Sequence, residues 1–460
     1  MNNTRGTKSK RGINMSRRSL SILSVSNFEG KRLLVIMSIV VVTLTVDSQI
    51  GYIADFIPEQ LASSVGIALF VGIWTIFAIT QYYILSYVKK INKESRARVR
   101  YFNLIHKIVT VAQFVLAGII ALVILQIFIA QEYNTAMLYS ALSISYGLWI
   151  VTLGLLARAF FSWYRLSKKN VMVLILALSM VAYVINGVLG LYEYIDHLAQ
   201  NNLIIRSGDV AFFPVFSIAK IADLIRITSH TASGVAYVLT WIGTVMLLRP
   251  YMKKLGSIKF WTIMSAAMVY YLIEFPLFVL GYYNPSEDVN AIANILIFSM
   301  SAVFTGIIFG AAFLSVARTL QTDSIVRNYM IIAAYGFVLF YVAGSALVSQ
   351  AAYPPYGLTA VSFTGLSCYM IYTGLYFSAI SVSQDIAVRK SIRKSVLEQS
   401  SLLDSIGSAQ MERELQTRVL TVAKKASDIM AKETGVEAPM TEDDMKDYMQ
   451  VVMKELQTKR

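Results

Sequence analysis

The stretch RLSKKNVMVLILALSMVAYVINGVLGLYEY, residues 165–194, decides the fold of this chain. It opens with three basic residues, continues as an apolar run from Val171, and closes with two tyrosines near its end. A helix that crosses the hydrocarbon core of a bilayer needs roughly 17–25 mostly apolar residues. Tyrosines favour the membrane–water interface, and basic residues stay on the cytoplasmic side. The stretch therefore predicts a transmembrane helix whose cytoplasmic end carries Lys168 and Lys169.

Runs of the same kind recur on both sides of this stretch. They predict an all-α fold, a polytopic transmembrane helix bundle of about ten spans over residues 32–385, with a short cytoplasmic helical tail at 386–460. Residues 1–31 are basic and have no apolar run, so we expect a disordered, uncleaved cytoplasmic leader. The predicted spans are residues 32–54, 62–88, 104–130, 136–163, 171–194, 229–249, 259–282, 290–318, 328–349 and 358–382.

The distribution of lysine and arginine orients this bundle. When ten spans place both termini in the cytoplasm, only Arg206, Lys220 and Arg226 of the 41 Lys and Arg residues fall on the outside. Basic loops resist crossing a membrane, so this asymmetry is an orientation signal. The sequence predicts a multi-pass protein of the cell membrane with cytoplasmic N- and C-termini, and the lipid bilayer is its first expected partner.

Composition points to the same class of protein. The chain is 56% hydrophobic and 15% charged, with a mean hydropathy of +0.58, which does not suit a soluble protein of 460 residues. Its basic pI of about 9.5 does not indicate a nucleic-acid partner, because the cations follow the alternation of the loops instead of forming one patch. The single cysteine, Cys368, lies inside the last predicted span and can form no internal disulfide.

The longest outer connection, residues 195–228, leaves two alternatives open. Pro214 suits the first position of a helix, and polar residues interrupt the apolar residues after it at every third position. This pattern favours a helix that lies flat in the outer membrane interface. The alternative is a helix that simply extends the following span.

The cytoplasmic tail begins with a basic segment and continues as an apolar seam. Arg389, Lys390, Arg393 and Lys394 lie directly after the last span, where they anchor the chain inside and can meet anionic headgroups. Apolar residues then recur at three- and four-residue steps, which indicates a helix that packs against another helix. The first part of this seam, which we interpret as an output helix, contains Ile392, Val396, Leu403 and Ile406.

After a phase break near Gly407 the seam continues from Met411 to Ile429, and Gly435 and Pro439 end the helix. A last helix is predicted at the C-terminus. Its apolar face can fold back on the preceding helix or bind a partner, and the sequence does not decide between them. The residues of this face are Met445, Tyr448, Met449, Val452, Met453 and Leu456.

Motifs of the common enzyme classes are absent from the sequence. It has no glycine-rich phosphate loop, no H-E-x-x-H, no G-x-S-x-G and no ATP-binding region of a histidine kinase. Three histidines, His106, His197 and His230, are too far apart in the sequence to indicate a metal site. We therefore predict a protein that is not an enzyme and needs no cofactor or metal.

Glu274 is the acid that the sequence places inside a span. A carboxylate in hydrocarbon is costly, so such a residue faces a cavity or a polar partner. Pro276, two residues later, frees a backbone carbonyl and can kink the helix. We interpret these residues as an intramembrane polar site, with Asn186, Asn294 and Gln113 as candidate partners. The alternative is a structural acid held by hydrogen bonds.

Asp47 closes the first predicted span. Together with Asp55 and Glu59 it predicts an acidic outer face. Such a face could attract cations, but acids are also simply the charged residues that cross a membrane more readily than bases.

The last quarter of the chain resembles a group of uncharacterised polytopic membrane proteins of archaea. The resemblance lies in PPYGLTAVSFTGLS at 354–367, SVSQDIAVRKSIRKSV at 381–396 and LLDSIGSAQMERELQTRV at 402–419. It implies an architecture and no functional residues. The chain is also loosely similar to multi-span sensor modules whose last span continues into a cytoplasmic signalling helix, although the kinase or cyclase output domain of those modules is missing.

Three functions remain compatible with these features. In the first, the bundle is a sensor that relays a helix movement to a separate cytoplasmic partner, and a second copy of the chain is a further expected partner. In the second, it is a secondary transporter of a small solute or ion coupled through Glu274. In the third, it is a non-catalytic subunit of a membrane complex.

Overall fold

The structure is a computed structural model of the 460-residue chain. It describes residues 32–51, 58–94, 100–166, 170–199, 202–207, 220–279, 291–320, 324–344, 352–384 and 400–434. The basic leader, residues 389–394 and the predicted C-terminal helix lie outside these ranges, as do Ile392 and Val396 of the predicted output seam.

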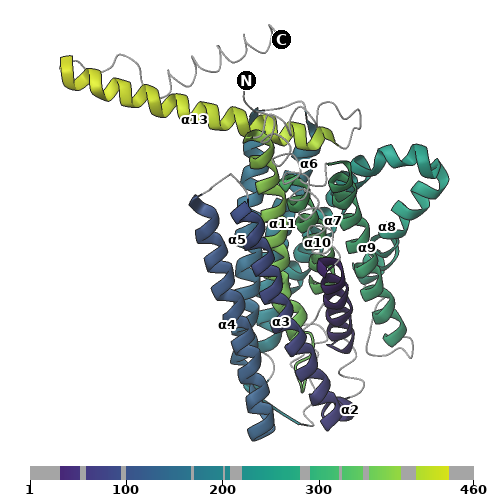
Figure 1. The fold of residues 1–460 in the computed structure, drawn as a ribbon. Helices are drawn as coiled ribbons and strands as arrows, with labels where there is room; N and C mark the ends of the chain where they lie inside the picture. The colour runs from purple at the N-terminus through teal and green to yellow at the C-terminus, as the bar shows by residue number, and fades with distance from the viewer. Residues whose placement is uncertain are drawn as a thin grey trace, which may run out of the picture.

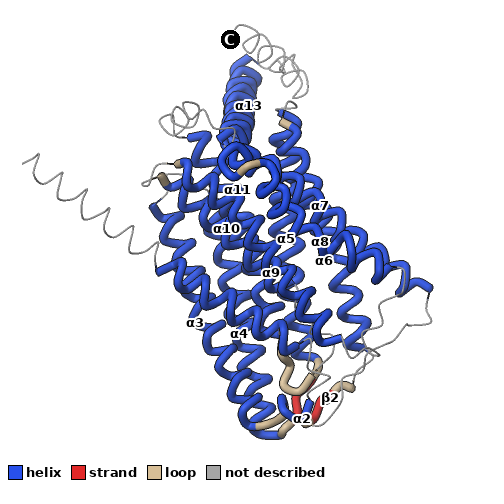
Figure 2. The backbone as a smooth tube through the Cα atoms, turned by 90° about the vertical axis from the view of Figure 1, so that its right-hand side faces the viewer, coloured by secondary structure: helices blue, strands red, loops and turns tan. Residues whose placement is uncertain are grey.

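The described part of the chain is a bundle of long helices (Figures 1 and 2). The first helix, Arg32–Gly51, is followed by further helices and two short strands. These elements are α2 (Pro58–Leu61), α3 (Ser64–Glu94), α4 (Arg100–Ala130), β1 (Glu132–Asn134), α5 (Ala136–Leu166), α6 (Val171–Ala199), β2 (Ile204–Arg206), α7 (Lys220–Leu255), α8 (Ser257–Val279), α9 (Ala291–Thr319), α10 (Ile325–Gly344), α11 (Leu358–Gln384) and α13 (Ser400–Thr434).

Nine helices within the described ranges are long and apolar enough to cross a bilayer, and they coincide with nine of the ten predicted spans. The all-α helical bundle predicted from the sequence is thus confirmed. The remaining predicted span, 259–282, overlaps α8, which is not among the nine. A tenth crossing therefore stays a prediction.

The helix α11 forms the centre of the bundle. It is the one candidate span in the described chain whose apolar window is entirely buried, and it packs mainly against α10 and α5. Glycines allow this close approach, because a Cβ on Gly374 would lie 2.5 Å from the backbone nitrogen of Ala333 in α10. A Cβ on Gly365 would lie 2.9 Å from the carbonyl oxygen of Ser145 in α5. Small residues at such positions let two helix backbones come together.

One end of the bundle, which we call the hairpin end, is closed by a two-stranded antiparallel sheet. β1 pairs with β2, so Tyr133 lies opposite Ile205. An ion pair of 2.9 Å joins Arg206 to Glu132. The Tyr133 hydroxyl donates to the carbonyl oxygen of Ala352 at 2.7 Å, just before α11. Segments that the sequence predicts to share one side of the membrane therefore lie at one end of the molecule.

The helix α13 lies at the opposite end. It crosses the end of the bundle at a steep angle to the spans, and its C-terminal half projects beyond them (Figure 1). Its first half packs against α11 and α5.

The connection between α6 and α7 is shorter than predicted. Helix α7 begins by Lys220 and continues without a break through the following span to Leu255. Over these residues the second alternative holds, in which the helix extends the span, and a separate interfacial helix is not present there. Residues 208–219, which include Pro214, lie outside the described chain.

Candidate functional site

The first part of the candidate site is a cap on the hairpin end of α11. The Asp47 carboxylate accepts hydrogen bonds from the backbone N–H groups of Gly357 at 3.0 Å and Ala360 at 2.8 Å. The first turn of a helix leaves N–H groups without intrahelical partners, and a carboxylate there is favoured by the helix dipole. Asp47 is 0% exposed, so the prediction that it forms part of an acidic outer face is wrong. Its side-chain oxygens are directed at a backbone instead of at the solvent.

Tyr356 holds the same end of α11 against α3. Its hydroxyl donates to the carbonyl oxygen of Gly66 at 2.6 Å, and its ring meets Phe70 edge-on at 5.5 Å between centroids. Burial, with a smaller contribution from the Asp47 carboxylate, raises the pKa of Tyr356 above its usual range. The phenol therefore keeps its proton and stays a donor over the physiological pH range.

Polar contacts continue along the middle of α11. The Ser145 hydroxyl of α5 donates to the carbonyl oxygen of Val361 at 2.6 Å and accepts from the N–H of Gly365 at 3.1 Å. Deeper in the bundle, Nδ1 of His106 in α4 lies 2.9 Å from the hydroxyl of Tyr369. These bonds fix α11 to α5 and to α4, each at a defined position along the helix.

The other end of α11 meets α13 at what we call the α13 junction, formed by Trp163, Ser383, Gln410 and Glu414. The indole Nε1 of Trp163 donates to Oε1 of Gln410 at 2.8 Å, and Nε2 of Gln410 donates to Oε1 of Glu414 at 3.1 Å. The Ser383 hydroxyl of α11 reaches the same Glu414 oxygen at 3.5 Å. The Trp163 ring also stacks on Tyr376 of α11, so α5, α11 and α13 share one buried contact.

Apolar packing completes this junction. Leu403 and Ile406 are fully buried, and Gly407 lies so close to Val382 of α11 that a Cβ there would be 2.3 Å from that side chain. We predicted Leu403 and Ile406 as part of the apolar seam of an output helix that packs against another helix. In the structure the end of the chain's own bundle covers both residues, and their role as an output seam stays a prediction.

A second polar cluster joins the helices on the other side of the bundle. The hydroxyls of Ser179 and Thr240 lie 2.6 Å apart, and Tyr183 lies 3.1 Å from Thr240 and also bonds to Tyr341. The Tyr237 hydroxyl bonds to Thr305 at 2.9 Å and to the carbonyl oxygen of Ala267. We call this set the hydroxyl network. It links α6, α7, α8, α9 and α10 through uncharged groups.

The predicted intramembrane site is described only in part. Glu274 and Pro276 lie in α8 and Asn294 in α9, and their side chains are outside the described part of the structure. Asn186 accepts a hydrogen bond from Ser229 of α7 at 3.3 Å. Gln113 donates to the carbonyl oxygen of Ser362 in α11 at 3.4 Å.

Gln113 and Asn186 are therefore not brought together. They bond to different helices, and α5 packs against both α4, which carries Gln113, and α6, which carries Asn186. Gln113 belongs to the surroundings of α11, where Gln81 of α3 is also buried. The side-chain oxygens of Gln81 and Gln113 have no hydrogen-bond partner among the described protein atoms, so each can accept from a bound water or polar ligand.

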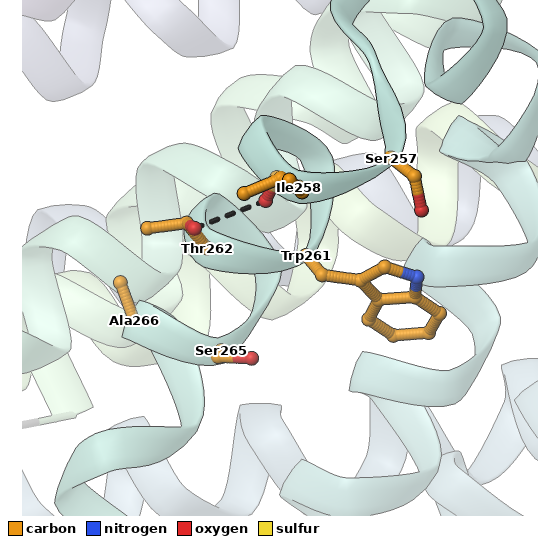
Figure 3. A pocket seen from close by; sticks show the side chains of 6 residues that line it. All are labelled: Ser257, Ile258, Trp261, Thr262, Ser265 and Ala266. Carbon is orange, nitrogen blue, oxygen red and sulfur yellow. Dashed lines mark hydrogen bonds between the residues drawn. The ribbon is translucent and has the colours of Figure 1, made fainter.

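One hollow in the described surface is open to the outside instead of enclosed. One face of α8 lines it, and the hydroxyl of Thr262 is bonded to its own helix, to the carbonyl oxygen of Ile258 at 3.0 Å (Figure 3). Ile258 is 84% exposed. The remaining lining residues are Ser257, Trp261, Ser265 and Ala266. A single open helix face of this kind does not form a binding pocket for a small molecule.

The outward faces of the helices carry large apolar side chains. On α4, Ile108, Phe114 and Leu122 are each about half exposed, whereas Gln113 and Leu116 on the inner face are buried. Water would penalise a contiguous apolar surface of this size, but lipid would not. The chain is a multi-pass integral membrane protein.

Comparisons with known proteins add no relative. Models of protein families, curated proteins and solved structures gave no match to this chain. The resemblance to the archaeal membrane proteins thus stays an expectation from sequence.

Sequence reasoning missed most of the residues that form the α11 contacts. No motif or spacing in the sequence singles out Trp163, Ser145 or Gln410 as contacts between helices.

Proposed function

We propose that the bundle is a sensor that passes a movement of α11 through the α13 junction to a separate cytoplasmic protein. The observation that carries this proposal is the anchoring of α11 at both ends. Asp47 holds one end, and the other end is joined to α13 by the bond of Ser383 to Glu414 and by the close packing of Val382 against Gly407.

The surroundings of α11 support a relay. Protein atoms enclose it along its length, so lipid cannot act on it directly and a change must reach it through neighbouring helices. Because a packed interior is not continuously deformable, a shift at the hairpin end is transmitted as a displacement of the whole helix. Ser383 lies at the last turn of α11 and bonds to Glu414, so this displacement acts on α13.

Two variants of similar chemistry test the relay. Trp163→Phe removes the indole bond to Gln410 at the α13 junction. Trp241→Phe removes an equivalent indole bond, from Nε1 to the carbonyl oxygen of Met264 at 2.9 Å, between α7 and α8. Crosslinking in intact membranes should capture a cytoplasmic protein that is lost when residues 386–460 are deleted.

The yield of the crosslinked cytoplasmic protein should change in Trp163→Phe and stay at the wild-type level in Trp241→Phe. An unchanged yield of the crosslinked protein after both the deletion and Trp163→Phe would contradict the relay.

A secondary transporter is the second candidate, and one contact favours it. Tyr237 bonds the hydroxyl network to α8 at Ala267, seven residues before Glu274 on the same helix. An ionisable residue on a helix beside a polar network is a typical arrangement of a proton or ion pathway. Under this proposal, Glu274→Gln abolishes solute flux in vesicles that contain the purified protein, whereas Glu132→Gln at the hairpin end leaves the flux unchanged. Equal flux in wild type and Glu274→Gln would remove Glu274 from the mechanism.

A further inference from the structure

The second half of α13 carries an exposed apolar seam. Leu415, Val419, Val422 and Ile429 are 47%, 50%, 67% and 48% exposed. They follow one another at steps of four, three and seven residues, the spacing of a helix that packs against another helix. We call these four residues the α13 seam.

The α13 seam points away from the bundle. Successive residues of a helix turn by about 100°. On this basis Leu403, Ile406 and Gln410, which face the bundle, lie on one side of α13. The α13 seam lies more than a quarter turn away from them, and its midline is closer to the opposite side of the helix. Thr417 and Thr421 continue the bundle-facing side beyond the junction. The seam is therefore directed away from the bundle, and the half of α13 that carries it projects beyond the other helices (Figure 1).

A basic row flanks the α13 seam. Arg418, Lys425 and Lys432 are exposed and spaced by seven residues, so they lie on one edge of the seam. In paired helices, the residues beside an apolar seam select the partner by charge. The occupant should therefore carry acidic residues along one edge of its own apolar stripe.

A second copy of the chain does not meet this requirement. Two copies in one membrane are related by a twofold axis along the membrane normal, and helices lying across that axis pair in antiparallel fashion. Such a pair places the basic row of each copy against the same row of the other. Like charges at that edge oppose the pairing.

We propose that residues 441–456 of the same chain cover the α13 seam as an antiparallel helix. A helix over these residues would be about 24 Å long, and the seam from Leu415 to Ile429 spans about 21 Å. Residues 435–440 contain Gly435 and Pro439, which suit the reversal of chain direction between two helices. The apolar stripe from Met445 to Leu456 supplies the complementary face.

Charge complementarity supports this occupant. In the antiparallel register that places Val452 opposite Val422, Asp444 comes beside Lys432 and Glu455 beside Arg418. Both acids lie on the edge of the stripe that meets the basic row. The docking rests on the exposed seam of α13 and on the sequence of residues 435–456, and it does not depend on the proposed function. If residues 441–456 cover the seam, a cytoplasmic protein reaches it only when they are displaced. This consequence rests on the proposed function.

A disulfide experiment on the full chain in membranes tests the docking. In one variant Val422→Cys is combined with Val452→Cys, and in the matched control Thr421→Cys is combined with Val452→Cys. The native Cys368 is buried in α11 and does not interfere. Under a mild oxidant, the first pair should form an intramolecular disulfide in several-fold higher yield than the control. Equal yields from both pairs, or a covalent dimer formed by Val422→Cys alone, would overturn the proposal.

A charge exchange gives an independent check. Glu455→Arg in the first pair should lower the disulfide yield several-fold, and adding Arg418→Glu should restore it. Failure of the restoration would refute the proposed register. Because the yield requires neither a stimulus nor a partner, this result is distinguishable from a failure of the relay.

Discussion

Asp47 and Ala360 are 313 positions apart in the sequence and are joined by a hydrogen bond of 2.8 Å between the carboxylate and the backbone N–H. The bond connects the end of the first helix to the start of the central helix. A backbone N–H at a helix start can donate to any suitably placed oxygen, so the sequence of α11 itself gives no sign of this partner.

Asp47→Ala should lower the thermal stability of the bundle. The variant leaves two buried N–H groups of α11 without an acceptor, and the loss of a helix cap costs about 0.5–2 kcal/mol. Asp47→Asn keeps one acceptor and should be intermediate. The measurement is thermal unfolding in detergent, with Glu132→Gln as the control because its ion pair with Arg206 is partly exposed to solvent. A midpoint for Asp47→Ala equal to that of the control would contradict the cap.

Gly374→Ala should destabilise the contact between α10 and α11. The added Cβ would lie 2.5 Å from a backbone nitrogen of α10, which cannot move aside as a flexible side chain could. Overpacking of this kind costs about 1–3 kcal/mol. Gly118→Ala in α4 is the matched control, because its Cβ would meet nothing within 4 Å. Unfolding midpoints should fall for Gly374→Ala alone, and an equal response of both variants would disprove the close packing.

Tyr369→Phe should expose the coupling between α4 and α11. The substitution removes the hydroxyl next to Nδ1 of His106 and leaves a buried nitrogen unpaired, which costs about 1–3 kcal/mol. In the background His106→Leu the same substitution should cost much less. A double-mutant cycle on unfolding free energies measures this difference. Additive effects would show that the two side chains do not interact.

Cysteines at two exposed positions should distinguish lipid from water. Leu122 of α4 and Leu203 next to β2 are 48% and 73% exposed. A thiol reacts through its thiolate, which does not form in hydrocarbon. A membrane-impermeant maleimide applied to intact cells should label Leu203→Cys and leave Leu122→Cys unlabelled. Labelling of Leu203→Cys only after permeabilisation would reverse the predicted orientation of the hairpin end.

The positions of the spans could be predicted from the sequence because each depends on its own composition. Val171–Asp196, for example, is apolar whatever surrounds it. The bounds of nine helices follow the predicted ones for this reason. The strands β1 and β2 could not be predicted, because three residues such as Glu132–Asn134 carry no periodicity and pair only through a partner about seventy residues away.

In the tail, too, the presence of a helix could be predicted from the sequence, whereas its contacts could not. A helix with an apolar seam could be predicted from its three- and four-residue steps. Which half of the seam is buried could not, because Leu403 and Val422 are equally apolar and differ only in whether the end of the bundle reaches them. The docking of α13 depends on Gln410 meeting Trp163, a relation between residues 247 positions apart.

The complete enclosure of α11 also constrains how the protein is made. Its window has the lowest mean hydropathy of the nine candidate spans, and hydroxyl-bearing side chains and glycines are frequent in it. Such a segment partitions weakly into lipid on its own. Since it leaves the ribosome after the eight other candidate spans, it must insert into a slot that those helices have already formed. Any truncation that ends before Leu358 would then leave an open bundle with a polar-lined gap in place of α11. Quality-control proteases should recognise that incomplete bundle.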